Sequence, residues 1–238
     1  SDIYVCNDYN KGDQFIINKG AQRLEDEIHS RLDHTSFYSM GSDAADINND
    51  GWLDFITLDM AFGNHYRSKT NMESMRPELF WRLVEEGEHF QYAVNNLQLN
   101  HGQGYFSDIA HLAGVSHTDW SWAPLFEDLD NDGRKDLLVS NGLLKDLRNN
   151  DFLNAMKSNK AQLNNNFEAA LAMMPSTPVN NIVYKNLGQL KFQDISETAG
   201  FSEKNFSSGM ASADLDNDGD MDIVINNSNG LTSVYENR

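Results

Sequence analysis

The sequence predicts an all-β fold, a fragment of a β-propeller with about three four-stranded blades, partial blades at both ends and two helical insertions. Three observations support this prediction. The acidic pattern D-x-[DN]-x-D-G-x-x-D occurs three times, a short apolar run follows every copy, and a Phe-x-Asp-Ile segment recurs at a fixed distance before two of them. Units of this kind leave apolar faces that only neighbouring units can cover, as the blades of a propeller do.

The three acidic copies, named acidic loops 1, 2 and 3 here, span residues 46–54, 128–136 and 214–222. Carboxylates at alternate positions repel one another unless a hard cation lies between them. Side-chain oxygens at positions 1, 3 and 5, a glycine at 6, a backbone carbonyl at 7 and an aspartate at 9 describe a Ca²⁺ loop. We expect about three bound Ca²⁺ ions, and the predicted ligands are Asp46, Asn48, Asp50, the carbonyl of Trp52 and Asp54; Asp128, Asp130, Asp132, the carbonyl of Arg134 and Asp136; and Asp214, Asp216, Asp218, the carbonyl of Asp220 and Asp222.

Two alternatives explain these loops less well. An EF-hand loop needs a Glu at position 12 and helices on both sides, whereas position 12 here is Thr57, Val139 or Ile225 and strand-forming residues follow each loop. A metal-free turn would explain one copy, since Asp, Asn and Gly dominate turns. It does not explain three copies that share the same ligand positions and the same downstream strand.

The repeat extends beyond the acidic loop. Phe106–Gly114 matches Phe192–Gly200, and both segments reach their loop after the same interval. A serine and then a small residue precede each loop at constant distances; these residues are Ser39 and Gly41, Ser121 and Ala123, and Ser207 and Gly209. One unit therefore reads as a strand ending in Asn, a turn, the Phe-x-Asp-Ile segment, a strand, the acidic loop and a further strand. This supplies the four strands of a propeller blade.

The predicted units are residues 18–60, 97–142 and 181–227, with partial units at 1–17 and 228–238. Asp2 aligns with position 9 of an acidic loop, so we expect a fourth loop truncated at this residue. We expect the chain to be a piece of a larger propeller, because about three units are fewer than the ~4–8 blades of a usual ring. A small ring closed by the two terminal pieces is the alternative.

Residues 61–96 and 143–180 interrupt two units at the same topological point. The apolar pattern predicts helices over Pro77–Glu86, Asp151–Met156 and Phe167–Met174. Equivalent insertion points place both segments on one face of the propeller, where they can form a lid or a partner-binding surface. The alternative is that their apolar sides cover each other and the propeller rim.

The repeats resemble the FG-GAP/VCBS repeats of α-integrin-type propellers, and the resemblance covers nearly the whole chain outside the two insertions. Residues 36–60, 97–142 and 181–227 are most similar to large VCBS-repeat surface proteins of Bacteroidetes-type bacteria, many of which carry an ASPIC/UnbV-type domain. The resemblance implies a seven-bladed propeller outside the cytoplasm, with Ca²⁺ in its loops and often an association with polysaccharide uptake. Loop 1 departs from the pattern, because the neutral Asn48 stands at position 3 and implies a weaker site.

The amino-acid composition disfavours several kinds of binding partner. The chain has 18 basic and 36 acidic residues and a formal net charge of −18, which disfavours binding to nucleic acid or to an anionic membrane surface. No apolar stretch approaches the ~20 residues of a membrane span, and the single Cys6 offers no disulfide framework. Extracellular calcium loops bind with Kd ~10⁻⁴–10⁻³ M, so cytosolic Ca²⁺ would leave them empty. We expect an extracellular or bacterial cell-surface location, associated with the outer membrane.

The sequence contains no recognisable catalytic motif, such as a nucleophile elbow, a phosphate loop or a zinc-binding His pair. The best candidate ligand site outside the loops is His117, Asp119, Trp120 and Trp122, whose indole rings can stack on a sugar. The alternative is that the two Trp residues pack between blades. We expect a non-catalytic, calcium-stabilised binding or scaffold module with a glycan or an outer-membrane protein as its partner. The alternative is a polysaccharide-degrading enzyme, a lyase or hydrolase, built on a calcium-bearing propeller.

Overall fold

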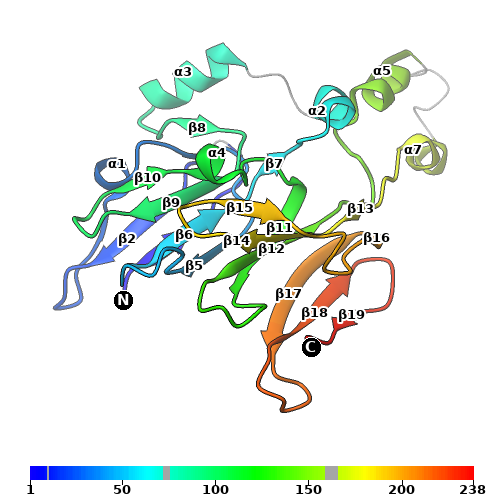
Figure 1. The fold of residues 1–238 in the computed structure, drawn as a ribbon. Coiled ribbons are helices and arrows are strands. Elements are labelled where there is room, and N and C mark those ends of the chain that lie inside the picture. The colour runs from blue at the N-terminus through cyan, green and yellow to red at the C-terminus, as the bar shows by residue number, and fades with distance from the viewer. Residues whose placement is uncertain (10, 72–75, 159–165) are drawn as a thin grey trace.

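A computed structural model of the chain describes residues 1–9, 11–71, 76–158 and 166–238. The protein is mostly β, and its strands form a series of antiparallel sheets that follow one another along the chain (Figure 1). The predicted β-rich architecture with helical insertions is confirmed. Within these ranges no helix has the length and apolar character needed to cross a membrane.

Four sheets make up the body of the molecule. The first has the order β1-β2-β3, the second β10-β9-β6-β5, the third β15-β14-β12-β11-β7 and the fourth β17-β18-β19. Their strands are β1 (Ile3–Val5), β2 (Gln14–Asn18), β3 (Leu24–Asp26), β5 (Ser42–Ala45), β6 (Asp54–Thr57), β7 (Met60–Ala61), β9 (Asn96–Asn100), β10 (Phe106–Asp108), β11 (Asp119–Glu127), β12 (Asp136–Asn141), β14 (Ile182–Asn186), β15 (Phe192–Asp194), β17 (Ser207–Ala213), β18 (Asp222–Asn227) and β19 (Ser233–Tyr235). Two short pairs complete the strands: β4 (Thr35–Ser36) with β8 (Gln91–Tyr92), and β13 (Val179–Asn180) with β16 (Lys204–Asn205).

The sheets are offset from the sequence repeat. Each acidic loop joins the first two main strands of a sheet, β5 to β6, β11 to β12 and β17 to β18, and the short β7 is an additional edge strand of the third sheet. The next two strands of the sheet come from the following repeat unit, as the pairing of Phe55 with Gln98 and of Leu138 with Val183 shows. Both insertions therefore lie inside a sheet, between its second and third strands.

The apolar run after each acidic loop forms the core between sheets. Leu137 and Val139 of β12 pack toward the second sheet, whereas Leu138 between them packs toward the fourth. All three are essentially inaccessible to solvent. Successive side chains of a strand point to opposite faces, so a strand covered on both faces needs a continuous apolar run rather than an alternating one.

Six helices lie among the described residues: α1 (Ile28–Arg31), α2 (His65–Asn71), α3 (Pro77–Glu85), α4 (Ala110–Ala113), α5 (Asn150–Ser158) and α7 (Phe167–Met173). The three predicted helices are confirmed as α3, α5 and α7. Helix α2 was not predicted, because its segment lacks an apolar stripe at helical spacing. Its first turn is held instead by Asn64, whose Oδ1 accepts the amide N–H of Arg67 at 3.1 Å.

The two insertions lie at the same end of the sheets, as their equivalent positions predict. Figure 1 shows α2, α3, α5 and α7 at the upper end, opposite the long β17–β18 loop. The Nδ2 of Asn150 at the start of α5 donates to the carbonyl of Lys69 in α2 at 3.1 Å. Phe152 is buried, whereas Tyr66 and Trp81 are 67% and 57% exposed. The insertions therefore pack on each other and also present aromatic side chains to solvent.

Gly41 allows the second and third sheets to approach each other. A Cβ added to this residue would lie 2.2 Å from the carbonyl oxygen of Trp122 in β11. Overpacking of this kind costs about 1–3 kcal/mol, so we expect Gly41→Ala to lower the free energy of unfolding by about that much in a denaturant titration. Gly209 occupies the equivalent place in its repeat and has no atom within 4 Å of an added Cβ. Gly209→Ala is the control and should change stability by less than about 0.5 kcal/mol; equal losses in both variants would contradict this account.

Candidate functional site

The three acidic loops adopt the same backbone conformation. Position 4 is left-handed in each, with φ values of 59° at Asn49, 56° at Asn131 and 65° at Asn217. The glycine at position 6 also has a positive φ, 89°, 84° and 99° in loops 1, 2 and 3. Asn and Gly adopt this conformation more readily than other residues, which explains why they recur at these two positions.

In each loop the side chain of the position-1 aspartate accepts hydrogen bonds from backbone amides of the same loop. In loop 2, Asp128 accepts the amide N–H of Asp132 at 3.0 Å and that of Gly133 at 2.9 Å. Asp46 accepts the equivalent amides of loop 1 at 3.0 and 2.8 Å. In loop 3, Asp214 keeps the bond to the glycine, at 3.2 Å. These bonds curl the loop so that the side chains at positions 1, 3 and 5 turn toward one point.

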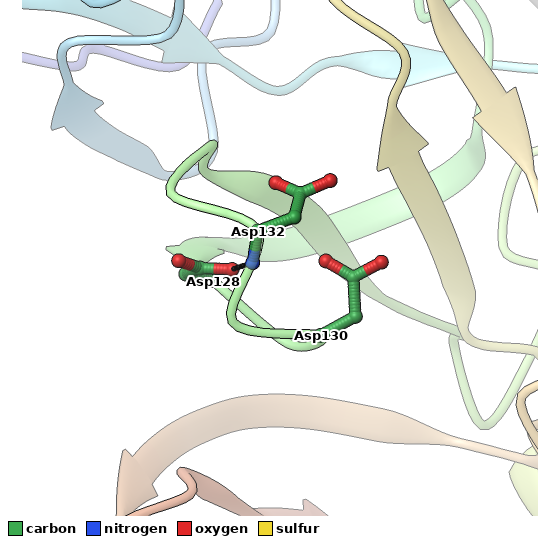
Figure 2. A group of neighbouring side chains, drawn as sticks. All are labelled: Asp128, Asp130 and Asp132. Atoms are coloured by element: carbon green, nitrogen blue, oxygen red, sulfur yellow. Dashed lines mark hydrogen bonds between the residues drawn. The ribbon is translucent and has the colours of Figure 1, made fainter.

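Figure 2 shows this convergence in loop 2, where Asp128, Asp130 and Asp132 surround a common space. One carboxylate oxygen from each of these residues lies within 4.8 Å of the others, and the same is true of Asp214, Asp216 and Asp218 in loop 3. In loop 1 the amide of Asn48 takes the place of the second carboxylate and donates to Asp50 at 2.9 Å. An all-oxygen donor set of this kind suits a hard divalent cation such as Ca²⁺.

The position-9 aspartate ties each loop to the neighbouring strand. Asp136 accepts the amide N–H of Leu129 at 3.3 Å through Oδ2 and that of Asn186 in β14 at 2.7 Å through Oδ1. Asp54 and Asp222 make the same two bonds in their loops. An ionised carboxylate has about four lone-pair sites, so each oxygen retains one for a cation.

Burial disfavours the ionised form of the aspartate at position 9. It raises the pKa of Asp54 to about 6, an effect that the two accepted amide bonds partly offset. Burial also raises the pKa of Asp136. A cation at either loop would favour the ionised form of these carboxyl groups.

Basic side chains distinguish loop 2 from loop 3. The ammonium group of Lys185 contacts Asp130, and the guanidinium of Arg134 contacts Asp132. The hydrogen bond from Lys185 lowers the pKa of Asp130. Among the described residues, no ion pair reaches the loop 3 carboxylates. Loop 3 therefore combines the highest density of negative charge with no competing ammonium group.

Asparagine side chains link successive loops into one row. Asn49 of loop 1 donates to the carbonyl of Gly133 in loop 2 at 2.9 Å, and Asn131 of loop 2 donates to Asp220 in loop 3 at 2.6 Å. Asn186, which ends β14, also donates to the carbonyl of Ile47 in loop 1 at 2.8 Å. We did not predict these links, although the Asn at position 4 of every loop was a visible signal.

The fourth predicted loop is represented by one residue. The Oδ1 of Asp2 accepts the amide N–H of Asn18 at 2.9 Å. Asp54 and Asp136 make the corresponding bond to the Asn that ends β9 and β14, and Asp222 makes it to Asn237, two residues after β19. The role of Asp2 in a calcium loop stays a prediction.

The four residues predicted as a ligand site lie at the opposite end of the third sheet. Trp120 is 7% exposed and packs among Tyr38, Met60 and Phe62. The Nε1 of Trp122 donates to the carbonyl of Gly142 at 2.7 Å. This placement favours the packing interpretation of Trp120, because its ring faces are covered by other side chains.

Asp119 and His117 belong to different local networks. Asp119 forms a two-bond ion pair with Arg67 of α2, at 2.6 and 2.8 Å, and Arg67 also lies 3.6 Å from Asp146 in the second insertion. Arg67 thus joins both insertions to β11, which the sequence did not reveal. His117 is partly buried; this burial and the nearby His111 lower its pKa, so its ring is neutral at neutral pH.

Comparison with known proteins identifies one family. The family model described as an FG-GAP-like repeat matches residues 76–139 and 169–225. The two matched segments include acidic loops 2 and 3, the strands before them and the first four residues of the strands after them. No curated protein matches the chain.

Proposed function

The chain belongs to the FG-GAP-like repeat family, and from this membership we propose that it is a calcium-stabilised β-propeller segment that acts as a non-catalytic binding or scaffold module of a secreted or cell-surface bacterial protein. Its partner is a glycan or an outer-membrane protein. The second and third sheets form blades of four main strands each, and the first and fourth belong to neighbouring blades of a larger ring.

The observation that carries the proposal is the agreement among the three acidic loops. Each has the same left-handed positions, and each position-9 aspartate makes the same two backbone bonds. Ca²⁺ would be held by the side-chain oxygens at positions 1, 3, 5 and 9 and by the carbonyls of Trp52, Arg134 and Asp220. Because the asparagine links connect neighbouring loops, an ion in one loop also supports the next sheet.

The location follows from the affinity expected of such loops. Exposed loops of the extracellular type bind Ca²⁺ with Kd ~10⁻⁴–10⁻³ M. Millimolar calcium outside the cell fills sites of this affinity, whereas the far lower cytosolic concentration does not. Three bound Ca²⁺ ions would supply six positive charges against the formal net charge of −18.

A glycan array probed with the purified chain, once in millimolar CaCl₂ and once in EDTA, tests the binding function. We expect calcium-dependent binding to a defined set of glycans, or calcium-dependent capture of one outer-membrane protein if the partner is a protein. Incubation with the bound polysaccharides should release neither unsaturated nor reducing ends. Steady release of such ends would show a lyase or hydrolase and overturn the non-catalytic assignment.

A further inference from the structure

A polar cavity of about 750 Å³ lies at the end of the third sheet, beneath the bases of both insertions. Its walls come from the segment before α2, from the start of β11, from β13 and β14, and from the turn after β15. Cavities of ~300–1,000 Å³ commonly hold small ligands. The acidic loops lie at the other end of the sheet, so this cavity is separate from the proposed metal sites.

The floor of the cavity is buried and hydrogen-bonded. Thr118 and Asn141 line it and are 2% and 1% exposed. Ser121 connects them, because it lies 2.7 Å from the hydroxyl of Thr118 and donates to Asn141 at 2.7 Å. Asn181, which also lines the cavity, donates to Ser207 at 2.9 Å. A floor fixed by such a network does not need to be ordered again when a ligand binds.

The walls present polar atoms that have no hydrogen-bond partner within the described part of the chain. They comprise donors, acceptors and one imidazole nitrogen able to act as either, and they are Asn64 Nδ2, His117 Nε2, Asn180 Oδ1, Asp194 Oδ2, the Glu197 carboxylate and the Ser202 hydroxyl. Val179, Ile182 and Ile195 add apolar surface to the same cavity. The lining therefore combines many directional polar groups with an apolar area of comparable size.

The charges of the lining residues limit the class of ligand that can bind in the cavity. No Lys or Arg is among the lining residues that the structure describes, and Asp194 and Glu197 have no basic partner there. An anionic ligand would face repulsion. A simple cation would leave the amide of Asn64 and the hydroxyl of Ser202 unmatched, which costs affinity. A neutral ligand rich in hydroxyl groups satisfies donors and acceptors together.

We propose that this cavity is a binding site for a neutral oligosaccharide, with Asp194 and Glu197 accepting hydrogen bonds from sugar hydroxyls and the Ile182 and Ile195 side chains contacting the pyranose ring. The inference rests on the proposed binding function and assigns it a location and a ligand class. Two of the four ligand-site residues expected from the sequence, His117 and Asp119, line this cavity, whereas Trp120 and Trp122 are not among its lining residues.

The test uses the whole chain in CaCl₂ and measures binding to cellohexaose, xylohexaose, mannohexaose and maltohexaose by calorimetry, with oligogalacturonate and spermidine as the charged probes. Glu197→Gln should weaken binding of the preferred neutral probe about tenfold, because a hydrogen bond to a charged acceptor becomes a weaker bond to a neutral amide oxygen. Thr198→Arg should abolish it by filling the cavity mouth. Glu203→Gln and Thr232→Arg, which make the same changes at exposed residues outside the lining, should bind as the unmodified chain does.

The outcomes of this test distinguish the proposed oligosaccharide site in the cavity from the proposed binding or scaffold function of the chain. Binding of a neutral probe that is unchanged in Glu197→Gln and Thr198→Arg would overturn the cavity assignment and leave the binding function intact. Binding of only oligogalacturonate or only spermidine would overturn the neutral class. If no hexaose binds, the oligosaccharide site is rejected, whereas the calcium-stabilised scaffold is judged separately by chelation.

Discussion

Chelation of calcium is expected to lower the free energy of unfolding of this chain by about 4 kcal/mol. If free Ca²⁺ is about ten times Kd, each occupied site adds ~1.4 kcal/mol, and three loops share the ligand pattern. For a chain of this size about 1 kcal/mol corresponds to 2–4 °C in Tm, so EDTA should lower Tm by roughly 10 °C. Differential scanning calorimetry in CaCl₂ and in EDTA, together with metal analysis of the purified protein, measures this directly.

A pair of loop 3 variants separates ion coordination from charge repulsion. Asp216→Ala removes a proposed side-chain ligand, so it should abolish roughly a third of the calcium-dependent rise in stability. Asp220→Asn removes the same charge but keeps the carbonyl ligand and the acceptor for Asn131, so it should keep nearly all of the rise. In EDTA both variants should melt close to the unmodified chain.

The calcium hypothesis fails if EDTA leaves Tm unchanged or if metal analysis finds no calcium. It also fails if NaCl at equal ionic strength stabilises as much as CaCl₂, because the effect would then be general screening. Equal losses in Asp216→Ala and Asp220→Asn would point to repulsion among carboxylates instead of coordination.

The second large effect is expected at Asp59, where Asp59→Asn should stabilise the chain at neutral pH. Asp59 is fully buried, and its Oδ2 accepts the amide N–H groups of Phe37 and Tyr38, both at 2.9 Å. Its Oδ1 has no hydrogen-bond partner among the described residues. The other two repeats have an asparagine at the position equivalent to Asp59. These residues, Asn141 and Asn227, each accept a serine hydroxyl through Oδ1. In the first repeat the equivalent serine, Ser39, donates to Asp13 instead, at 2.7 Å.

The pH dependence follows from the buried charge. Burial is the main cause that raises the pKa of Asp59 from 3.8 to about 7, with a smaller contribution from Asp13. The folded chain therefore holds this proton up to about pH 7, whereas the unfolded chain releases it near pH 4. Stability falls as pH rises through this window, by about 4 kcal/mol at 1.36 kcal/mol per pKa unit. Because Asn cannot ionise, the free energy of unfolding of Asp59→Asn should not show this decrease as the pH rises.

Chemical denaturation at a series of pH values between 4 and 8 measures the difference between Asp59→Asn and the unmodified chain. The gain should be small at pH 4 and largest at pH 7 to 8. Asp13→Asn is the contrast: burial raises the pKa of Asp13 too, but its carboxylate accepts bonds from Tyr4, Asn7 and Ser39. This second variant should destabilise the chain at neutral pH. A constant difference across the pH range for Asp59→Asn would refute the buried-charge account.

Local features of the molecule could be predicted from the sequence because they depend on near neighbours. The spacing of Asp128, Asp130, Asp132 and Asp136 decides the geometry of loop 2, since covalent connection and short-range hydrogen bonds curl nine residues in one way. The apolar run over Leu137–Val139 predicted a strand directly after loop 2, and β12 confirms it. That both faces of this strand are buried became clear only from the sheets. Helices α3, α5 and α7 follow from the apolar periodicity and terminal signals of their own segments.

Features that join distant segments were decided only by the tertiary structure. Four features depend on residues far apart in the chain: the offset between sheets and repeat units, the Arg67 ion pairs, the buried Oδ1 of Asp59 without a described partner, and the cavity at the end of the third sheet. The sequence alone indicated His117, Asp119, Trp120 and Trp122 as one group, but packing buries Trp120 and pairs Asp119 with Arg67. The physical reason is that burial and charge pairing are set by which sheets and insertions meet, and the pattern within one segment carries little information about that.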